Sequence, residues 1–374
     1  MIDNAFGLIY TGEQSGRLKD LTLSRSVAAV PFGGRYRAID FILSDMVNAG
    51  ITGVGLITEK NYSSLMDHLG AGKEWDLHRK RDGLFLLPPF LTNENAGVFR
   101  GTVDAIRSVS DFIRRTPNEY VILAGSRAIL NVDLVPMMEQ HLSTGADITI
   151  LYAEDGTLQP EEHSPDLRLI LDETGRVTEM ELDAYRPRSV NRSCDVMIMT
   201  KALLEYLLEE AYTHGEYDFH RDVLLKKCQT LMIMGHKYEG FVARLESVEG
   251  YFANSMALLN PDVRKDLFDP RHPIYTKVKD EVAARYSVSA VVKNSLVADG
   301  CVIEGDVENS ILFRGVTVKP GAHIINSIVM QGAEVGENVL LDHVILDKGV
   351  KILPGRTLQG YDSFPIVIRK NQTV

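Results

Sequence analysis

Short apolar runs alternate with amphipathic stretches over the first two thirds of the chain. Strands that alternate with helices indicate an α/β fold, with a mostly parallel sheet covered on both faces. Such sheets bind ligands at the carboxyl ends of their strands, where segments 11–17 and 125–127 are expected. The apolar runs predict buried strands at Ala5–Tyr10, Gly53–Thr58, Tyr120–Ala124 and Ala146–Tyr152. Apolar spacing predicts helices at Phe41–Ala49, Thr102–Arg114 and Leu134–Leu142. Thr102 is a candidate cap for its helix, and Asp104 suits the positive end of the helix dipole.

The last quarter of the chain is repetitive. Four segments begin at Asn294, Asn309, Asn326 and Asp342, spaced 15, 17 and 16 residues apart. Each opens on polar residues followed by aliphatic ones, and the first three reach glycine at their seventh residue. This period predicts a hexapeptide-repeat parallel β-helix with three short strands in each coil. Each coil buries its aliphatic side chains only against its neighbours.

Residues 245–285 follow neither pattern. A helix is predicted at Val248–Leu259, and prolines then interrupt the segment at positions 261, 270 and 273. We interpret the segment as a linker that packs across both domains. The predicted division is 1–244 for the α/β domain, 245–286 for the linker with its helix, and 287–374 for the β-helix.

Composition narrows the classes of function. The net charge of -11 argues against a nucleic-acid surface. Cys194, Cys228 and Cys301 lack the spacing of a metal site, which indicates reduced thiols. The start of the chain lacks the pattern of a secretory signal, and no apolar stretch approaches the length of a membrane span. We therefore expect a cytoplasmic protein that acts on neither nucleic acid nor membrane.

Three phrases carry a resemblance to a known family. They are AVPFGGRYRAIDFILSDMVNAGI at 29–51, FRGTVDAIRSVSDFI at 99–113 and ADGCVIEGDVENSILFRGV at 298–316. Together they resemble the sugar-nucleotide pyrophosphorylases, and in particular glucose-1-phosphate adenylyltransferase. The resemblance implies a Rossmann-like nucleotidyltransferase domain followed by a left-handed β-helix. The family reaction is attack of glucose 1-phosphate on the α-phosphorus of ATP, with release of pyrophosphate.

The resemblance also implies a nucleotide site whose catalytic groups have been replaced. The residues that match the nucleotide side of the family motif are Gly12, Gly16, Arg17, Gly101, Thr102 and Asp104. Val27 stands where the family has a lysine, and Asp183 stands where a lysine grips the sugar phosphate. Arg127 and Arg244 stand where two aspartates hold Mg²⁺. An arginine about 4 Å from such an ion would oppose it by roughly 8 kcal/mol at an effective dielectric constant near 20.

We therefore expect no catalytic residue, no metal site and no cofactor in this chain, with Mg²⁺ bound only by a catalytic partner. The resemblance is to the non-catalytic, regulatory subunit type that some bacteria pair with the catalytic adenylyltransferase. It implies a heterotetramer with that subunit, and a homo-oligomer when the chain is alone. It also makes Arg25, Arg35 and Arg37 candidates for an effector site for phosphorylated metabolites, with a structural role as the alternative.

Three other hypotheses remain open at this point. The chain could be an active adenylyltransferase with a rebuilt site, in which Arg127 and Arg244 bind phosphates in place of the metal. It could be a β-helix acyltransferase, for which His323 and His343 are the available bases. It could also be a sensor of sugar phosphate or nucleotide that has no enzymatic partner.

Overall fold

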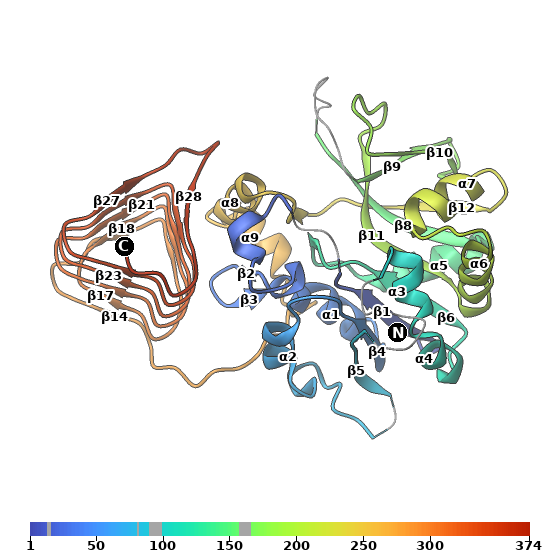
Figure 1. Ribbon diagram of the computed structural model, residues 1–374, viewed down its shortest axis with the longest axis horizontal. Helices are drawn as coiled ribbons and strands as arrows, with labels where there is room; N and C mark the ends of the chain where they lie inside the picture. Colours follow the sequence, from blue (N-terminus) through green and yellow to red (C-terminus); the bar gives the residue numbers. More distant parts are fainter. Residues whose placement is uncertain (13–15, 81, 90–98, 157–165) are drawn as a thin grey trace.

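The structure is a computed structural model of the 374-residue chain, and it describes residues 1–12, 16–80, 82–89, 99–156 and 166–374. An α/β domain lies at one end of the molecule and a β-helix at the other, with two linker helices between them (Figure 1). The predicted fold class is confirmed. In the part of the chain that is described, no helix is both long and apolar enough to cross a membrane.

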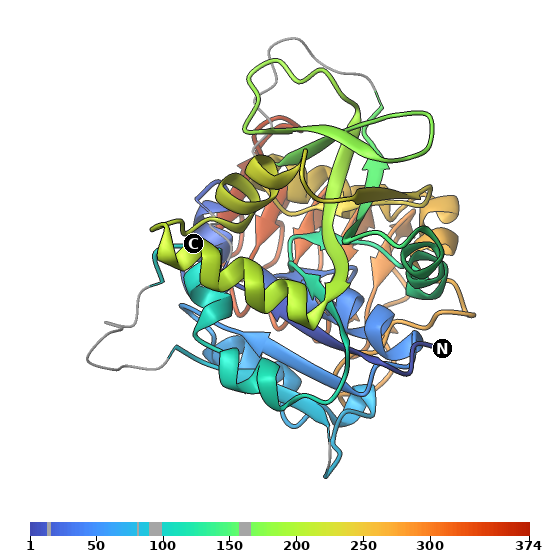
Figure 2. The same cartoon turned by 90° about the vertical axis from the view of Figure 1, so that its right-hand side faces the viewer.

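Nine strands of the described residues form the central sheet of the α/β domain (Figure 2). Its order is β10-β9-β11-β6-β1-β4-β5, with β8 beside β11 and β12 beside β8. The β6-β1-β4-β5 side is parallel, whereas β11 runs antiparallel to both β6 and β8. The strands are β1 (Ala5–Tyr10), β4 (Gly53–Ile57), β5 (Gly83–Leu87), β6 (Tyr120–Ala124), β8 (Ile148–Glu154), β9 (Leu167–Leu171), β10 (Val177–Leu182), β11 (Asn191–Thr200) and β12 (Ile233–Tyr238). Two small ribbons pair β2 (Pro31–Phe32) with β3 (Tyr36–Arg37) and β7 (Ala128–Ile129) with β13 (Ala243–Arg244).

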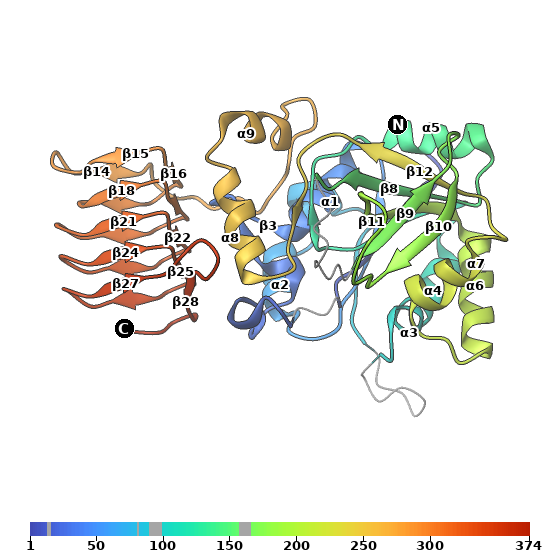
Figure 3. The same cartoon turned by 90° about the horizontal axis from the view of Figure 1, so that it is seen from above.

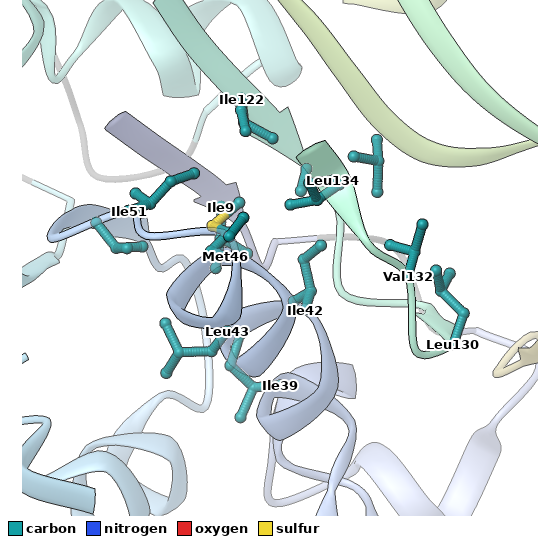
Figure 4. Close-up of a cluster of buried hydrophobic side chains, with 14 of the residues drawn as sticks. Ile9, Ile39, Ile42, Leu43, Met46, Ile51, Ile122, Leu130, Val132 and Leu134 are labelled. Carbon is teal, nitrogen blue, oxygen red and sulfur yellow. The ribbon is translucent and has the colours of Figure 1, made fainter. Parts of the chain in front are cut away.

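Helices cover both faces of this sheet because its strands are apolar on both sides. In β1, Ala5 and Ile9 pack with α1, α2 and α5, whereas Phe6 and Leu8 pack with α3, α4 and α6. Figure 4 shows the first of these layers, in which Ile39, Ile42, Leu43 and Met46 of α1 meet the sheet. The helices of this domain are α1 (Ala38–Asn48), α2 (Ser63–Leu69), α3 (Thr102–Arg107), α4 (Ser110–Arg115), α5 (Leu134–Thr144), α6 (Lys201–Thr213) and α7 (Leu225–Lys227).

The helix predicted at Thr102–Arg114 is two helices, α3 and α4. The hydroxyls of Ser108 and Ser110 donate to the carbonyls of Ala105 and Arg107, at 2.7 and 2.5 Å, where the chain changes direction. Thr102 does not cap α3 as expected. Its hydroxyl instead accepts a hydrogen bond from the Phe219 N–H at 2.8 Å.

Residues 285–368, all of which are described, form three parallel sheets of five strands each. Figure 3 shows the stacked coils of this left-handed β-helix from above. The first sheet is β14 (Arg285–Tyr286), β17 (Val302–Ile303), β20 (Thr317–Val318), β23 (Glu334–Val335) and β26 (Lys351–Ile352). The second is β15 (Val292–Lys293), β18 (Asp306–Glu308), β21 (His323–Ile325), β24 (Leu340–Asp342) and β27 (Thr357–Gln359). The third is β16 (Leu296–Val297), β19 (Ile311–Leu312), β22 (Ile328–Val329), β25 (Val344–Leu346) and β28 (Ile366–Ile368).

The same corner recurs at positive φ in successive coils, at Asn294, Asn309, Asn326 and His343. Asparagine suits this corner because its short polar side chain tolerates left-handed backbone. The Asn294 amide donates to the Asn309 side chain at 2.8 Å, which ties one coil to the next. The fourth repeat therefore begins at His343, one residue later than the start at Asp342 that the sequence predicted.

The linker carries α8 (Val248–Ala257) and α9 (Pro261–Leu267). The sequence predicted the first and missed the second, in which Asn260 accepts from the Asp262 N–H at 2.9 Å and Pro261 opens the helix. One apolar cluster joins the linker to both domains. It includes Phe32 and Phe41 of the α/β domain, Tyr251 and Phe252 of α8, and Ile311, Ile328 and Ile345 of the β-helix.

Candidate functional site

A cavity of about 290 Å³ opens at the carboxyl ends of β1 and β6. This is the edge of the sheet where the sequence predicted ligand binding. The start of α3, the end of β10 and a helical turn at Phe219–Leu224 close its other sides. Apolar side chains contribute to its lining, among them Leu123, Met197 and Phe219. We call it the sheet-edge pocket.

Only some of the nucleotide-side residues predicted from the sequence line this pocket. Gly12, Gly101 and Thr102 line the sheet-edge pocket, and Asp104 pairs with Arg100, a lining residue, at 2.6 Å. Gly16 and Arg17 are exposed and do not belong to the lining. Among the described residues, the sheet-edge pocket therefore brings Gly12, at the start of the predicted loop, close to the start of α3.

Each arginine that lines the sheet-edge pocket is paired with a carboxylate. Arg100 pairs with Asp104, Arg221 pairs with Asp183 at 2.5 Å, and Arg127 pairs with Asp195 at 3.0 Å. Arg100 also lies over the Tyr217 ring, 3.9 Å from its centroid. The Asp183–Arg221 pair places a cation next to the position where the resemblance implied a lysine.

Arg127 and Arg244 belong to a set of four arginines and four acids, which we call the arginine–carboxylate network. Its members are Arg127, Arg168, Arg192, Arg244, Asp155, Asp166, Asp195 and Glu246. Arg192 contacts Asp166 and Glu246 and lies 3.2 Å from Asp155. Arg127 contacts Asp166 at 3.2 Å, and Arg244 donates to the Ser193 carbonyl at 2.7 Å. The network joins β9, β11 and β13 to the end of β6.

The protonation of the network follows from burial and charge together. Burial alone would raise the pKa of Asp166, but the guanidinium groups of Arg127 and Arg192 outweigh it and hold that pKa well below its usual range. Burial and the neighbouring Asp166 carboxyl raise the pKa of Glu246. Guanidinium groups stand at both positions where the resemblance implied metal-binding aspartates. The side chains at these two positions do not fit Mg²⁺.

Val27 lies away from the sheet-edge pocket. It is 1% exposed and packs in the apolar cluster that joins the domains, with Leu18, Leu21 and Phe41. The local chain explains this, since Val27–Ala29 is a short buried helical turn leading into β2.

A second, strongly basic cavity of about 170 Å³ lies between the two domains. Arg35 and Arg37 line it from the β2–β3 ribbon. The sequence proposed both residues for an effector site. Lys277 and Lys279 of the linker and Arg314 and Lys348 of the β-helix complete a ring of six cationic side chains, with Asp67 and His68 beside them. We call it the basic cleft.

The third proposed effector residue, Arg25, does not line the basic cleft. It is 2% exposed, and its guanidinium donates to both oxygens of Asp347 in the β-helix at 2.8 Å. It therefore bridges the two domains in a buried ion pair.

Burial and neighbouring cations lower the pKa values of two side chains in the basic cleft. Burial, with the charges of Arg37 and Arg25, lowers the pKa of Lys348 to about 7. Burial lowers the pKa of Arg37 to about 10, although Asp40 opposes the shift. Lys277, Lys279, Arg314 and Lys348 could not be assigned from the sequence, because they lie more than 200 residues from Arg37 and carry no local motif.

Comparison with known proteins agrees with this architecture. A family profile described as "Nucleotidyl transferase" matches residues 6–163, and one described as "GlmU-like, C-terminal hexapeptide" matches residues 280–363. The chain is 40% identical to the "Glycogen biosynthesis protein GlgD" of Bacillus subtilis, over 94% of this chain and 92% of the relative. It is 38% identical to the protein of the same name from Geobacillus stearothermophilus, over 99% of this chain and 97% of the relative.

Other relatives are named as enzymes. The "Glucose-1-phosphate adenylyltransferase" of Bacillus mycoides is 33% identical, over 94% of both chains. The similarity extends through the α/β domain, the linker and the β-helix, so it covers the sheet-edge pocket and the basic cleft. The chain belongs to the glucose-1-phosphate adenylyltransferase family, in which it resembles the GlgD proteins.

Proposed function

We propose that this chain is a regulatory, catalytically deficient subunit of glucose-1-phosphate adenylyltransferase in glycogen biosynthesis. It modulates the catalytic subunit that makes ADP-glucose from ATP and glucose 1-phosphate. The arginine–carboxylate network carries the proposal, because Arg127 and Arg244 take the two positions of the family's metal-binding acids. The GlgD relatives, named for glycogen biosynthesis, support the pathway.

The proposed partner is a catalytic subunit of the same family, in a heterotetramer, and the chain forms a homo-oligomer without it. Binding to the partner shifts the partner's equilibrium toward its competent conformation, or changes its response to an effector. Such coupling between subunits has a typical magnitude of about 1–3 kcal/mol.

An assay of the chain alone and mixed with the catalytic subunit tests this proposal. We expect the chain alone to make ADP-glucose at least about a thousandfold more slowly than the catalytic subunit, since metal-assisted charge neutralisation is missing. At a saturating ratio, we expect the catalytic subunit's kcat or activator constant to change by about fivefold or more. An unrelated protein at the same concentration is the control.

Two results would contradict the proposal. The first is rapid ADP-glucose synthesis by the chain alone that is abolished in Arg127→Ala, which would establish a rebuilt active site. The second is a catalytic subunit whose kcat and activator constant do not respond to the chain at any ratio.

The basic cleft supports a second part of the proposal, that the regulatory subunit binds a phosphorylated metabolite between its domains. Six cations from three parts of the chain surround this small cavity. An anion bound there would relieve their mutual repulsion. Because the cleft is built from both domains, its ligand would also hold the β-helix and the α/β domain in one arrangement.

Proton uptake should accompany anion binding in the basic cleft. The pKa of Lys348 is about 7 in the free cleft, and a nearby anion favours the charged ammonium, so binding raises that pKa. We therefore expect the affinity for sulfate, which does not titrate near neutral pH, to fall up to about tenfold between pH 6.5 and 8.5. Isothermal titration at constant ionic strength measures it.

Lys348→Met separates this effect from a general dependence on charge. We expect it to bind sulfate more weakly and with an affinity that hardly changes with pH. Lys265→Met, at an exposed lysine of α9, should behave as the wild type does. A wild-type affinity that is constant over this pH range would contradict the role of Lys348.

A further inference from the structure

The end of β1 holds two side chains that the resemblance does not explain. Tyr10 is the last residue of β1, and Glu59 follows β4, its parallel neighbour. The Tyr10 hydroxyl lies 3.4 Å from the Glu59 carboxylate, to which it donates. Between them, the Thr11 N–H and hydroxyl both donate to the Ile57 carbonyl at 3.0 Å, which fixes the chain as it leaves β1.

The ends of these two side chains lie against Gly12. A Cβ built on Gly12 would lie 2.5 Å from the Tyr10 hydroxyl oxygen and 2.6 Å from a Glu59 carboxylate oxygen. A side chain at position 12 would therefore have to displace the ends of Tyr10 and Glu59. In a phosphate-binding loop, such a glycine lets a phosphate approach the backbone. Here the chain's own phenol and carboxylate occupy the space beside Gly12.

The charge of Glu59 opposes phosphate binding, as does the space that Tyr10 and Glu59 occupy. A carboxylate beside Gly12 repels a polyphosphate, and the cations around the sheet-edge pocket, Arg100, Arg127 and Arg221, are each paired with an acid. The described lining therefore offers a nucleoside triphosphate little of the charge compensation that its binding needs.

We propose that Tyr10 and Glu59 close the phosphate side of the sheet-edge pocket, so that this chain has lost nucleotide binding there as well as metal-dependent catalysis. The Tyr10 ring and the Glu59 carboxylate close the pocket, and the arginine–carboxylate network plays no part in this closure. This inference deepens the proposed function, since it specifies that the regulatory subunit does not respond to nucleoside triphosphate through this pocket.

The test is ATP binding in the presence of EDTA, followed by hydrogen–deuterium exchange of the peptides that span residues 99–107 and 121–127. A local measurement is needed because ATP is also an anion that the basic cleft could hold. In Tyr10→Ala/Glu59→Gln, we expect ATP to protect these peptides with a half-saturating concentration at least tenfold lower than in the wild type. Tyr10→Phe retains the ring and should resemble the wild type.

Two outcomes would overturn the inference. One is protection of the wild-type peptides at the same ATP concentration as in the double variant. The other is a folded double variant whose peptides gain no protection at any ATP concentration. Glu59→Gln alone alters only a charge at a half-buried position, and it covers the case in which Tyr10→Ala does not fold. It should lower the half-saturating concentration by a smaller factor, and no change would count against the inference.

The proposed function can fail independently of this inference. ATP protection of the wild-type pocket, in a chain that remains inactive alone but still modulates its partner, would overturn only the closure of the pocket. A chain that excludes ATP but has no effect on the catalytic subunit would overturn only the regulatory role.

Discussion

Arg25→Ala is expected to lower the free energy of unfolding by about 3–5 kcal/mol, because it leaves the Asp347 carboxylate buried without the guanidinium that pairs with it. The two side chains are each 2% exposed and form a two-point ion pair across the domain boundary. Few other contacts combine so much burial with charge. Denaturant unfolding followed by circular dichroism measures the loss.

Two further variants test whether the loss in Arg25→Ala comes from leaving a buried charge without its opposite charge. Arg25→Met/Asp347→Leu replaces both charges with apolar groups of similar size, and we expect it to recover most of the lost stability. Arg271→Ala breaks an exposed pair with Asp269 and should hardly change the free energy of unfolding, because solvent screens this pair. An Arg25→Ala loss as small as that of Arg271→Ala would contradict the importance of the buried bridge.

Arg192→Ala is expected to have an effect of similar size, about 3–5 kcal/mol at pH 7.5. Arg192 is the centre of the arginine–carboxylate network and contacts Asp155, Asp166 and Glu246. Without it, three acids share fewer cations in a site that excludes most water. Arg192→Lys should lose an intermediate amount, because one ammonium cannot reach all three carboxylates in the planar geometry of a guanidinium.

The loss in Arg192→Ala should depend on pH. In the wild type the folded-state pKa of Asp166 is depressed, so its pairing stabilises the fold above the unfolded pKa of about 4 and is lost as the pH falls below it. In the variant Glu246, whose pKa is already raised by burial and by Asp166, loses its guanidinium partner, so we expect that pKa to rise further. The difference in stability between the two proteins should therefore be smaller at pH 5 than at pH 7.5.

Arg188 offers the matched control for this experiment. It lies four residues from Arg192 and is exposed, where it pairs with Glu179 and Glu181. We expect Arg188→Ala to leave the free energy of unfolding nearly unchanged at either pH, because solvent screens its ion pairs. An Arg192→Ala loss that is equal at both pH values would contradict the charge argument.

Much of the fold could be predicted because its signals are local. The apolar runs of β1 and β6 gave their bounds correctly, and the repeat period predicted the β-helix. Errors of one or two residues occurred where the periodicity fades, as at the start of β8 and the fourth coil. The break between α3 and α4 depends on two serine hydroxyls, whose competition for carbonyls an apolar pattern does not record.

The candidate sites were harder to predict because they join distant residues. Comparison of motifs found Arg127 and Arg244, but Arg168 and Arg192 were missed although each interrupts a buried strand. A lone arginine inside an apolar strand is a signal of a buried ion pair and could have identified both. Glu59 carried no such signal, since only the pairing of β1 with β4 brings it to Tyr10 and Gly12.

The shared apolar cluster has a consequence for how this chain can be divided. Phe32 and Phe41 come from the first fifty residues, and Ile311 and Ile328 come from the last seventy, yet they belong to one cluster with Tyr251. A cut anywhere in the linker would expose aromatic and aliphatic surface on both fragments. The two halves therefore cannot be exchanged between relatives as independent modules. A chimera would need to replace α8 together with the β-helix sheet that contains β19, β22 and β25, because their side chains share this cluster.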